Sequence, residues 1–133
     1  MKVFLDTNVL VSAFASRGIC ADIFELVLLE HDLLTGENVL RELGKALRQK
    51  IRLPAAVVSE VVDLVEGEAL AFIKDSAPLR APVDDDDARV LGEATHGGAD
   101  LFVTGDAALL KLGRVDRLQI VSPRQFWELL HTR

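Results

Sequence analysis

The first residues of the chain contain the stretch that decides the fold, Lys2-Val3-Phe4-Leu5-Asp6-Thr7-Asn8. There a short apolar run is followed directly by polar residues. A second stretch of this kind, Leu101-Phe102-Val103-Thr104-Gly105-Asp106, lies near the other end of the chain. Continuous apolar runs of this length are typical of parallel β-strands that are buried on both faces of a sheet. We therefore expect two such strands, each followed by an aspartate at its carboxyl end.

Between and beyond these stretches, short apolar runs alternate with longer segments of helical period. This alternation predicts βαβ units and a three-layer α/β/α fold around a mostly parallel sheet of about five strands. The expected strands are residues 2–5, 33–35, 79–81, 101–103 and 118–121, with 79–81 as a short edge strand between Pro78 and Pro82. The expected helices are residues 19–30, 38–51, 54 to about 72, 87–95, 107–112 and a last one from Ser122, which has a capping box with Pro123 and Gln125.

Composition limits the class of protein. The chain has 133 residues, and we expect residues 1–133 to form a single domain. Half of the residues are apolar and 27% are charged, which excludes intrinsic disorder. The net charge is −6 and there is no basic tail, so nonspecific wrapping of duplex DNA is not expected. The sequence has neither a signal-peptide core nor a run of roughly 18 apolar residues, which predicts a soluble cytoplasmic protein.

Acidic residues gather where the predicted strands end. Asp6 and Asp106 each follow a strand, and the run Asp84-Asp85-Asp86-Asp87 precedes a helix. Each of these residues could instead serve as a helix cap, and carboxylates are favoured in a first helical turn. However, carboxylates that converge on one sheet edge repel one another unless a cation neutralises them. Oxygen ligands without cysteine or clustered histidine select hard cations, so the sequence predicts an Mg²⁺ or Mn²⁺ site of the kind used in phosphate-ester chemistry.

The segment 38–51 has an apolar stripe and a basic stripe. The apolar stripe consists of Leu40, Leu43, Leu47 and Ile51. Glu42 lies on neither stripe, and periodicity alone indicates that its side chain is exposed to solvent. The basic stripe is either a solvated helix face or a strip that tracks phosphates, and its members are Arg41, Lys45, Arg48 and Arg52.

Several of these motifs together resemble the PIN-domain ribonucleases. The first is Asp6-Thr7-Asn8-Val9-Leu10, and the second is Val39-Leu40-Arg41-Glu42-Leu43 on the following helix. The others are the four aspartates leading into Val90-Leu91-Gly92-Glu93-Ala94, the stretch from Ala99 to Asp106, and the ending Ile120-Val121-Ser122-Pro123-Arg124-Gln125-Phe126. The motifs keep the order and spacing of the family over essentially the whole chain.

The resemblance implies a set of site residues and partners. It implies that Asp6, Glu42, Asp87 and Asp106 bind Mg²⁺ or Mn²⁺ and act in catalysis, with Asp84 and Asp86 as competitors for the third position. It also implies that Asn8 and Thr104 support the acidic cluster. A chain of this length is similar to the toxin of VapBC-type toxin–antitoxin pairs. Such a toxin cuts RNA, usually forms a homodimer and binds a small antitoxin protein.

Two other functions remain open from the sequence. A phosphoacceptor receiver domain would have a similar fold, but it needs an acidic pair after the first strand and a Lys after the last. Asp6 supplies one acid, and Ser122-Pro123 stands where that Lys would be. The other alternative is a PIN fold that binds RNA or a partner without cleaving it.

Overall fold

A computed structural model describes residues 1–132 of the chain. These residues form six strands in one sheet, ordered β3-β2-β1-β4-β6-β5. All neighbouring strands are parallel except β5 and β6, which are antiparallel. The strands are β1 Lys2–Leu5, β2 Asp32–Gly36, β3 Ala71–Ile73, β4 Leu101–Val103, β5 Arg114–Val115 and β6 Leu118–Val121.

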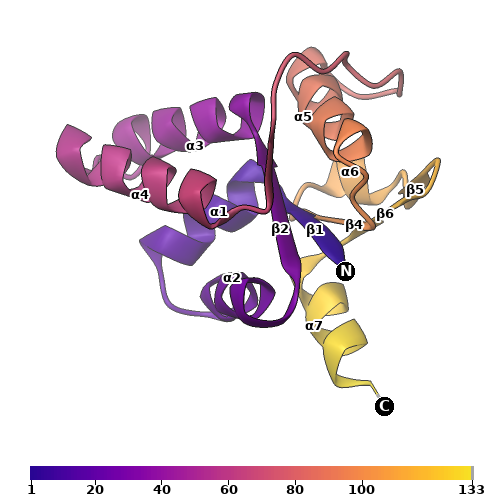
Figure 1. The fold of residues 1–133 in the computed structure, drawn as a ribbon, viewed down its shortest axis with the longest axis horizontal. Coiled ribbons are helices and arrows are strands. Elements are labelled where there is room, and N and C mark those ends of the chain that lie inside the picture. Colours follow the sequence, from indigo (N-terminus) through magenta and orange to yellow (C-terminus); the bar gives the residue numbers. More distant parts are fainter. Residues whose placement is uncertain (133) are drawn as a thin grey trace.

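Helices cover both faces of this sheet. They are α1 Thr7–Ala15, α2 Ile19–Glu30, α3 Glu37–Gln49, α4 Ala55–Glu68, α5 Asp85–His96, α6 Ala107–Leu110 and α7 Pro123–His131. In Figure 1, α1 to α4 lie on one side of strands β1 and β2, and α5 lies on the other. Helix α7 packs next to α2. The predicted three-layer α/β/α fold is therefore confirmed. Among residues 1–132, no helix has the length and apolar character needed to cross a membrane.

The central strands are buried as their apolar sequences predict. Every side chain from Val3 to Leu5 is at most 1% exposed. The rings of Phe4 and Phe102 stack between the neighbouring strands β1 and β4, with their centroids 5.6 Å apart. This pairing fixes the register of β1 against β4, so Asp6 and Thr104 follow the two strands at the same edge of the sheet.

The third strand lies elsewhere than the sequence predicts. Residues 79–81 are not a strand, and β3 is formed by Ala71–Ile73, so the expected helix from Pro54 ends at Glu68. The segment before Pro82 follows α5 instead of the sheet, because the Leu79 amide donates to the Ala88 carbonyl at 2.9 Å. A Cβ atom on Gly92 would come within 2.2 Å of the Ala77 carbonyl oxygen, so this segment lies directly on that helix.

Two elements are missing from the sequence prediction. Helix α1 begins at Thr7, immediately after β1, and Asp6 is its N-cap. The polar residues at this point therefore start a helix as well as bordering the sheet edge. Strand β5 has only two residues and pairs antiparallel with β6, which brings the sheet to six strands where about five are expected.

Candidate functional site

Four acidic side chains line one pocket at the carboxyl ends of β1 and β4. They are Asp6, Glu42, Asp87 and Asp106, and the pocket has a volume of about 450 Å³. Asp6 follows β1 and Asp106 follows shortly after β4, while Glu42 comes from α3 and Asp87 from α5. Four segments that are far apart in the sequence thus contribute one carboxylate each. The other residues that line it are Thr7, Asn8, Val11, Ser12, Ala15, Ala46, Lys50 and Ile51.

Asp6 is held in one orientation by hydrogen bonds to both of its oxygens. Its side chain is 5% exposed. Oδ1 accepts from the Thr7 amide at 2.8 Å, and Oδ2 accepts from the Thr104 hydroxyl at 2.7 Å and from Asn8 Nδ2 at 3.1 Å. Burial raises the pKa of Asp6, although these hydrogen bonds favour the charged form. A carboxylate has about four lone-pair sites, so one stays free for a further ligand.

Asn8 and Thr104 connect the first acidic residue to the last. Asn8 Nδ2 also donates to Thr104 Oγ1 at 3.3 Å, and Asn8 Oδ1 accepts from the Gly105 amide at 2.8 Å. The Thr104 hydroxyl in turn accepts from the Asp106 amide at 3.0 Å. A Cβ atom on Gly105 would lie 3.3 Å from Asn8 Oδ1, so glycine allows this close approach. The two polar residues predicted to support the acidic cluster therefore lie between Asp6 and Asp106.

Asp106 combines a structural contact with its position in the pocket. It is the N-cap of α6, and its Oδ1 accepts from the Ala108 amide at 2.8 Å. Its negative charge contributes to the raised pKa values of Asp6 and Asp87. The capping role that the sequence leaves open is thus present, and it does not remove the carboxylate from the pocket.

Glu42 is partly buried, which differs from the exposure that helical periodicity indicates. Its Oε1 accepts from the Thr7 hydroxyl at 2.7 Å. Burial is the main cause that raises the pKa of Glu42, and the negative charges of Asp6 and Asp86 add to it. Periodicity misjudges this residue because it describes only the face that α3 turns to the core, and the start of α1 covers a second face.

The structure separates the members of the acidic run 84–87. Asp84 is the N-cap of α5, where its Oδ1 accepts from the Asp87 amide at 2.8 Å, and Asp86 pairs with Arg89. Asp87 alone among the four lines the pocket. The pKa of Asp87 is raised to about 7, mainly by burial and then by the negative charges of Asp84, Asp106, Asp6 and Glu42.

The donor set of the pocket suits a hard divalent cation. All four acidic side chains offer carboxylate oxygens, which Mg²⁺ and Mn²⁺ prefer. Three of them have raised pKa values to which neighbouring carboxylates contribute, so a bound cation would relieve a repulsion. Within residues 1–132, no group of three or more His, Cys, Asp or Glu side chains is already arranged to hold a metal ion. Coordination by several of these carboxylates therefore requires their side chains to rotate toward one another.

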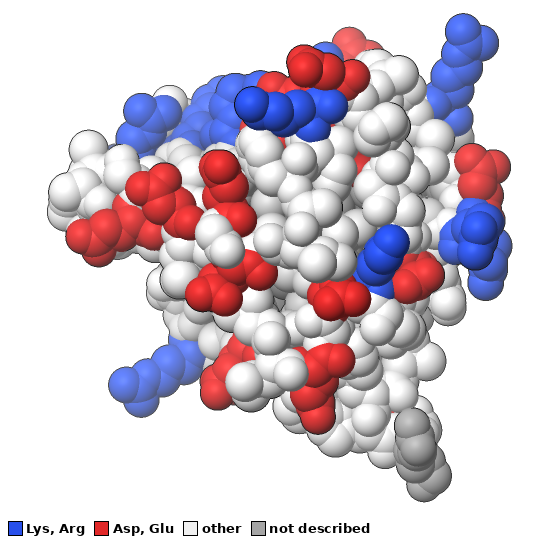
Figure 2. Space-filling model, in the orientation of Figure 1, with Lys and Arg blue, Asp and Glu red and all other residues white. Residues whose placement is uncertain are grey.

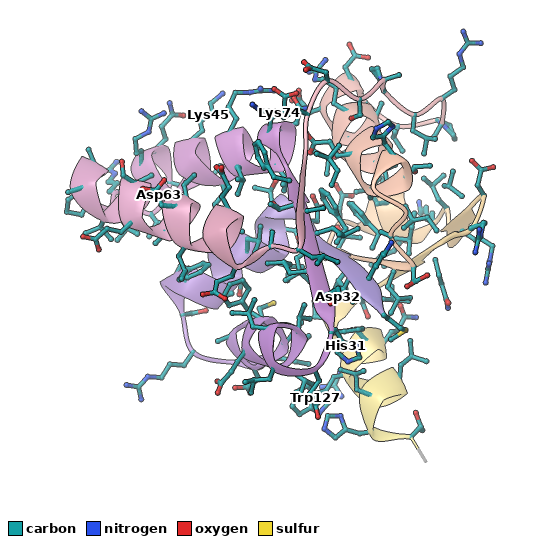
Figure 3. All side chains as sticks on the ribbon, in the orientation of Figure 1. His31, Asp32, Lys45, Asp63, Lys74 and Trp127 are labelled. Atoms are coloured by element: carbon teal, nitrogen blue, oxygen red, sulfur yellow. The ribbon has the colours of Figure 1, made fainter. Side chains whose placement is uncertain are left out.

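Basic side chains border the acidic pocket along α3. Lys and Arg side chains gather over the region of α3 (Figure 2), and Lys45 projects outward from this helix (Figure 3). Lys45 lines a small neighbouring pocket together with Glu42 and Thr7. Arg41 and Arg48 of α3 are also exposed, as is Arg52, but α3 ends at Gln49 and not at residue 51 as the sequence predicts, so Arg52 lies beyond the helix. None of the three lines the pocket that holds the four acids.

Lys50 is a basic residue of this region that sequence reasoning misses. It lines both the acidic pocket and the neighbouring one, and it is the C-cap of α3. Because Lys50 lies outside the regular spacing of the basic stripe, periodicity does not identify it. The sequence contains no signal that identifies it, because the expected helix runs to residue 51 and only the structure shows that α3 ends at Gln49.

Comparison with known proteins adds independent observations. A protein-family model described as PIN domain matches residues 2–108. A chain from the crystal structure of VapBC2 from Rickettsia felis bound to a DNA fragment from their promoter has a similar fold, with a TM-score of 0.67 and 18% identity. The similarity covers 92% of this chain and 98% of that one.

A second solved structure also has a fold similar to that of this chain. It is VapBC-1 from nontypeable Haemophilus influenzae, with a TM-score of 0.66, 16% identity, and coverage of 93% of this chain and 99% of that one. No curated protein matches the sequence. At these identities the two solved structures establish the fold, and the matched family model spans all four acidic residues of the pocket.

Proposed function

The chain belongs to the PIN-domain family, and from this premise we propose that it is a metal-dependent endoribonuclease, the toxin of a toxin–antitoxin pair. The observation that carries this proposal is that Asp6, Glu42, Asp87 and Asp106 line one pocket. Neighbouring carboxylates contribute to the raised pKa values of Asp6, Glu42 and Asp87, so a bound cation or proton would stabilise this pocket. Membership of the PIN-domain family rules out the alternative of a phosphoacceptor receiver domain. The residue after β6, where such a domain needs a Lys, is Ser122, and it is the N-cap of α7.

In this proposal the four carboxylates are the ligands of Mg²⁺ or Mn²⁺. When bound, such an ion polarises the scissile phosphate and lowers the pKa of the attacking water. Asn8 and Thr104 orient Asp6, because they donate to the same carboxylate oxygen. Lys45 and Lys50 line a pocket together with Glu42 and are suited to bind phosphates of the substrate.

RNA is the proposed substrate, and the basic side chains support this choice. Arg41, Lys45 and Arg48 on α3, and Arg52 just beyond its end, offer exposed positive charge next to a site of negative charge, which suits a strand whose phosphates follow this helix. Further partners are a second copy of the chain, as a homodimer, and a small antitoxin protein. The solved structures of similar fold, which are VapBC assemblies, support the antitoxin. In this proposal the protein acts in the cytoplasm.

Incubation with nucleic acids of matched sequence tests the proposed substrate. A mixed pool of single-stranded RNA and the same sequences as DNA are incubated with the protein and Mg²⁺ or Mn²⁺, and then with a chelator. We expect internal cleavage of RNA that the chelator stops, with DNA left largely intact. Cleavage that continues in excess chelator, or equal cleavage of DNA, would contradict the proposal.

The basic residues of α3 lead to a prediction about binding. Arg41→Ala combined with Lys45→Ala should weaken RNA binding for all sequences, because contacts to phosphates do not depend on the base. If each side chain neutralises one phosphate of a single strand, the negative slope of log K against log salt should become shallower by about 1.4. Fluorescence anisotropy over a salt series, in chelator to prevent cleavage, measures both effects.

The control for this double variant removes the same charge elsewhere. Arg114 and Arg117 are exposed on and next to β5, at the far edge of the sheet. Arg114→Ala with Arg117→Ala should leave the salt slope close to that of the parent. If the two double variants behave alike, the α3 residues are an ordinary solvated surface.

A further inference from the structure

Glu93 is a fully buried carboxylate outside the acidic pocket. Its side chain is 0% exposed and lies in the last half of α5. Oε2 accepts from the Asn38 amide at 2.7 Å and from Asn38 Nδ2 at 2.9 Å, and Oε1 accepts from the Val39 amide at 3.3 Å. All of these donors belong to the first turn of α3. A buried charge is tolerated only when its oxygens are satisfied, and here one helix provides every donor.

Glu93 supplies the N-terminal cap that α3 lacks in its own sequence. The N-cap residue of α3 is Gly36, which has no side chain to accept the free amides of the first turn. A Cβ atom on Gly36 would lie 2.4 Å from the Glu93 carboxyl carbon. The φ angle of Gly36 is −156°, a value that alanine also adopts, so the Glu93 carboxylate and not the backbone demands glycine here.

This contact joins the two helices that carry Glu42 and Asp87. Glu42 follows Asn38 by four residues, so it lies about 6 Å, roughly one helical turn, beyond the anchored amides. Asp87 precedes Glu93 by six residues, or about 9 Å along α5. The Asn38 and Glu93 bonds are thus a short, buried link between two acids that come from different layers of the fold.

We propose that Glu93 is a positioning residue, which fixes Glu42 relative to Asp87 by holding the first turn of α3 against α5. This proposal rests on the function proposed above, since it assigns Glu93 to the geometry of the same metal site. Glu93 does not touch the substrate or the metal. It acts through the backbone of α3, and a small rotation of that helix would change the distance over which the Glu42 side chain must reach the other carboxylates.

Replacement of Glu93 by glutamine tests this role with almost no change in volume. The glutamine oxygen can accept the Asn38 donors, but its NH₂ group then faces the Val39 amide, and two donors oppose each other. In Glu93→Gln we expect Mn²⁺ affinity and kcat for RNA cleavage to fall about 10- to 100-fold, the range for a residue that orients metal ligands. RNA binding in chelator should change less than about threefold, because the exposed basic side chains remain.

A second variant breaks the same contact from the other side. Gly36→Ala introduces a Cβ atom where the Glu93 carboxylate lies, and it leaves every titratable group in place. We expect it to reproduce the loss of Mn²⁺ affinity. In a Glu93→Ala background the space is free, so adding Gly36→Ala should cause little further loss, and the two changes should be strongly non-additive.

The control variant loses stability without disturbing the link between the helices. Val27 is fully buried in α2, which packs on the side of the sheet away from α5. Val27→Ala should lower Tm but, well below Tm, it should keep the Mn²⁺ affinity and kcat of the parent. Equal losses in Val27→Ala and Glu93→Gln would overturn the proposal, as would Mn²⁺ affinity in Glu93→Gln within twofold of the parent.

Amide hydrogen exchange separates this proposal from the proposed function. In Glu93→Gln and Gly36→Ala, loss of protection should be concentrated in the first two turns of α3, from Asn38 to Leu43. If the parent itself neither binds Mn²⁺ nor cleaves RNA, the proposed function fails, and exchange alone decides the positioning role. Protection in this segment that stays at the parent's level in both variants would overturn the role of Glu93.

Discussion

Asp6→Asn should abolish RNA cleavage and leave the protein folded. Asp6 is the most constrained of the four acids, and asparagine removes the charge that a cation needs. The NH₂ group of asparagine must face a donor at one of the two oxygen positions, so we expect a lower Tm but a folded protein. Loss of a residue that only orients a metal ligand costs about 10- to 100-fold, so loss of a ligand itself should cost more than about 100-fold in kcat. Single-turnover cleavage of labelled single-stranded RNA at saturating Mn²⁺ measures this loss, and circular dichroism verifies the fold.

The matched control for Asp6→Asn is Asp100→Asn. Asp100 also accepts a hydrogen bond from a backbone amide, that of Lys2 at 2.8 Å. However, Asp100 precedes β4 and so lies at the amino ends of the strands, whereas Asp6 lies at their carboxyl ends. Its replacement should leave cleavage within about twofold of the parent. If Asp6→Asn cleaves RNA as fast as Asp100→Asn does, Asp6 is only the N-cap of α1 and the site assignment is wrong there.

Asp87→Asn should stabilise the metal-free protein at neutral pH. The pKa of Asp87 in the folded protein is about 7 and that of an unfolded chain is about 3.9, so the folded state binds more protons between these values. The parent therefore loses stability as pH rises from about 4 to about 7. A shift of three pKa units corresponds to about 4 kcal/mol, and screening of this partly exposed group reduces the effect to about 1–2 kcal/mol.

Thermal melts at pH 5 and pH 7.5, with and without Mn²⁺, measure this effect. Without metal, the Tm of the parent should fall between the two pH values by more than that of Asp87→Asn. Added Mn²⁺ should raise the Tm of the parent by mass action and raise that of the variant less.

Asp85→Asn is the control, because Asp85 is exposed in the same acidic run and does not line the pocket. Asp85→Asn removes the same unit of charge, so an equal gain in Tm from both variants would mean that net charge, and not crowding in the pocket, causes the effect.

Much of the fold could be predicted from short apolar runs. Residues Val3–Leu5 of β1 and all of β4 are buried and apolar, so only Lys2 at the start of β1 interrupts the apolar pattern of these two strands. The position of Asp6 and Asp106 at one edge follows from the parallel arrangement alone. The sequence prediction of the edge strand is wrong, because the three-residue strand Ala71–Ile73 begins soon after α4 ends at Glu68 and its apolar residues continue the helical period.

The candidate site could be predicted only in part. Periodicity predicts that the Glu42 side chain is exposed to solvent, and only the resemblance to a family identifies this residue as part of the site. The contacts that decide its environment come from Thr7, which is 35 residues away in the sequence. Glu93 shows the same limit, since its hydrogen bonds reach across 55 residues to Asn38 and no local pattern reports them. Lys50 is a third case, because the way the chain leaves α3 brings it to the pocket.

The dependence of the RNA cleavage rate on free Mn²⁺ concentration tests the central claim most directly. The claim is that the four carboxylates form one divalent-metal site that cleaves RNA. The account predicts no cleavage in chelator, a rate that rises with Mn²⁺ and saturates, and no such rise in Asp106→Asn. A rate that is independent of Mn²⁺, or a saturation curve that Asp106→Asn leaves unchanged, would contradict it.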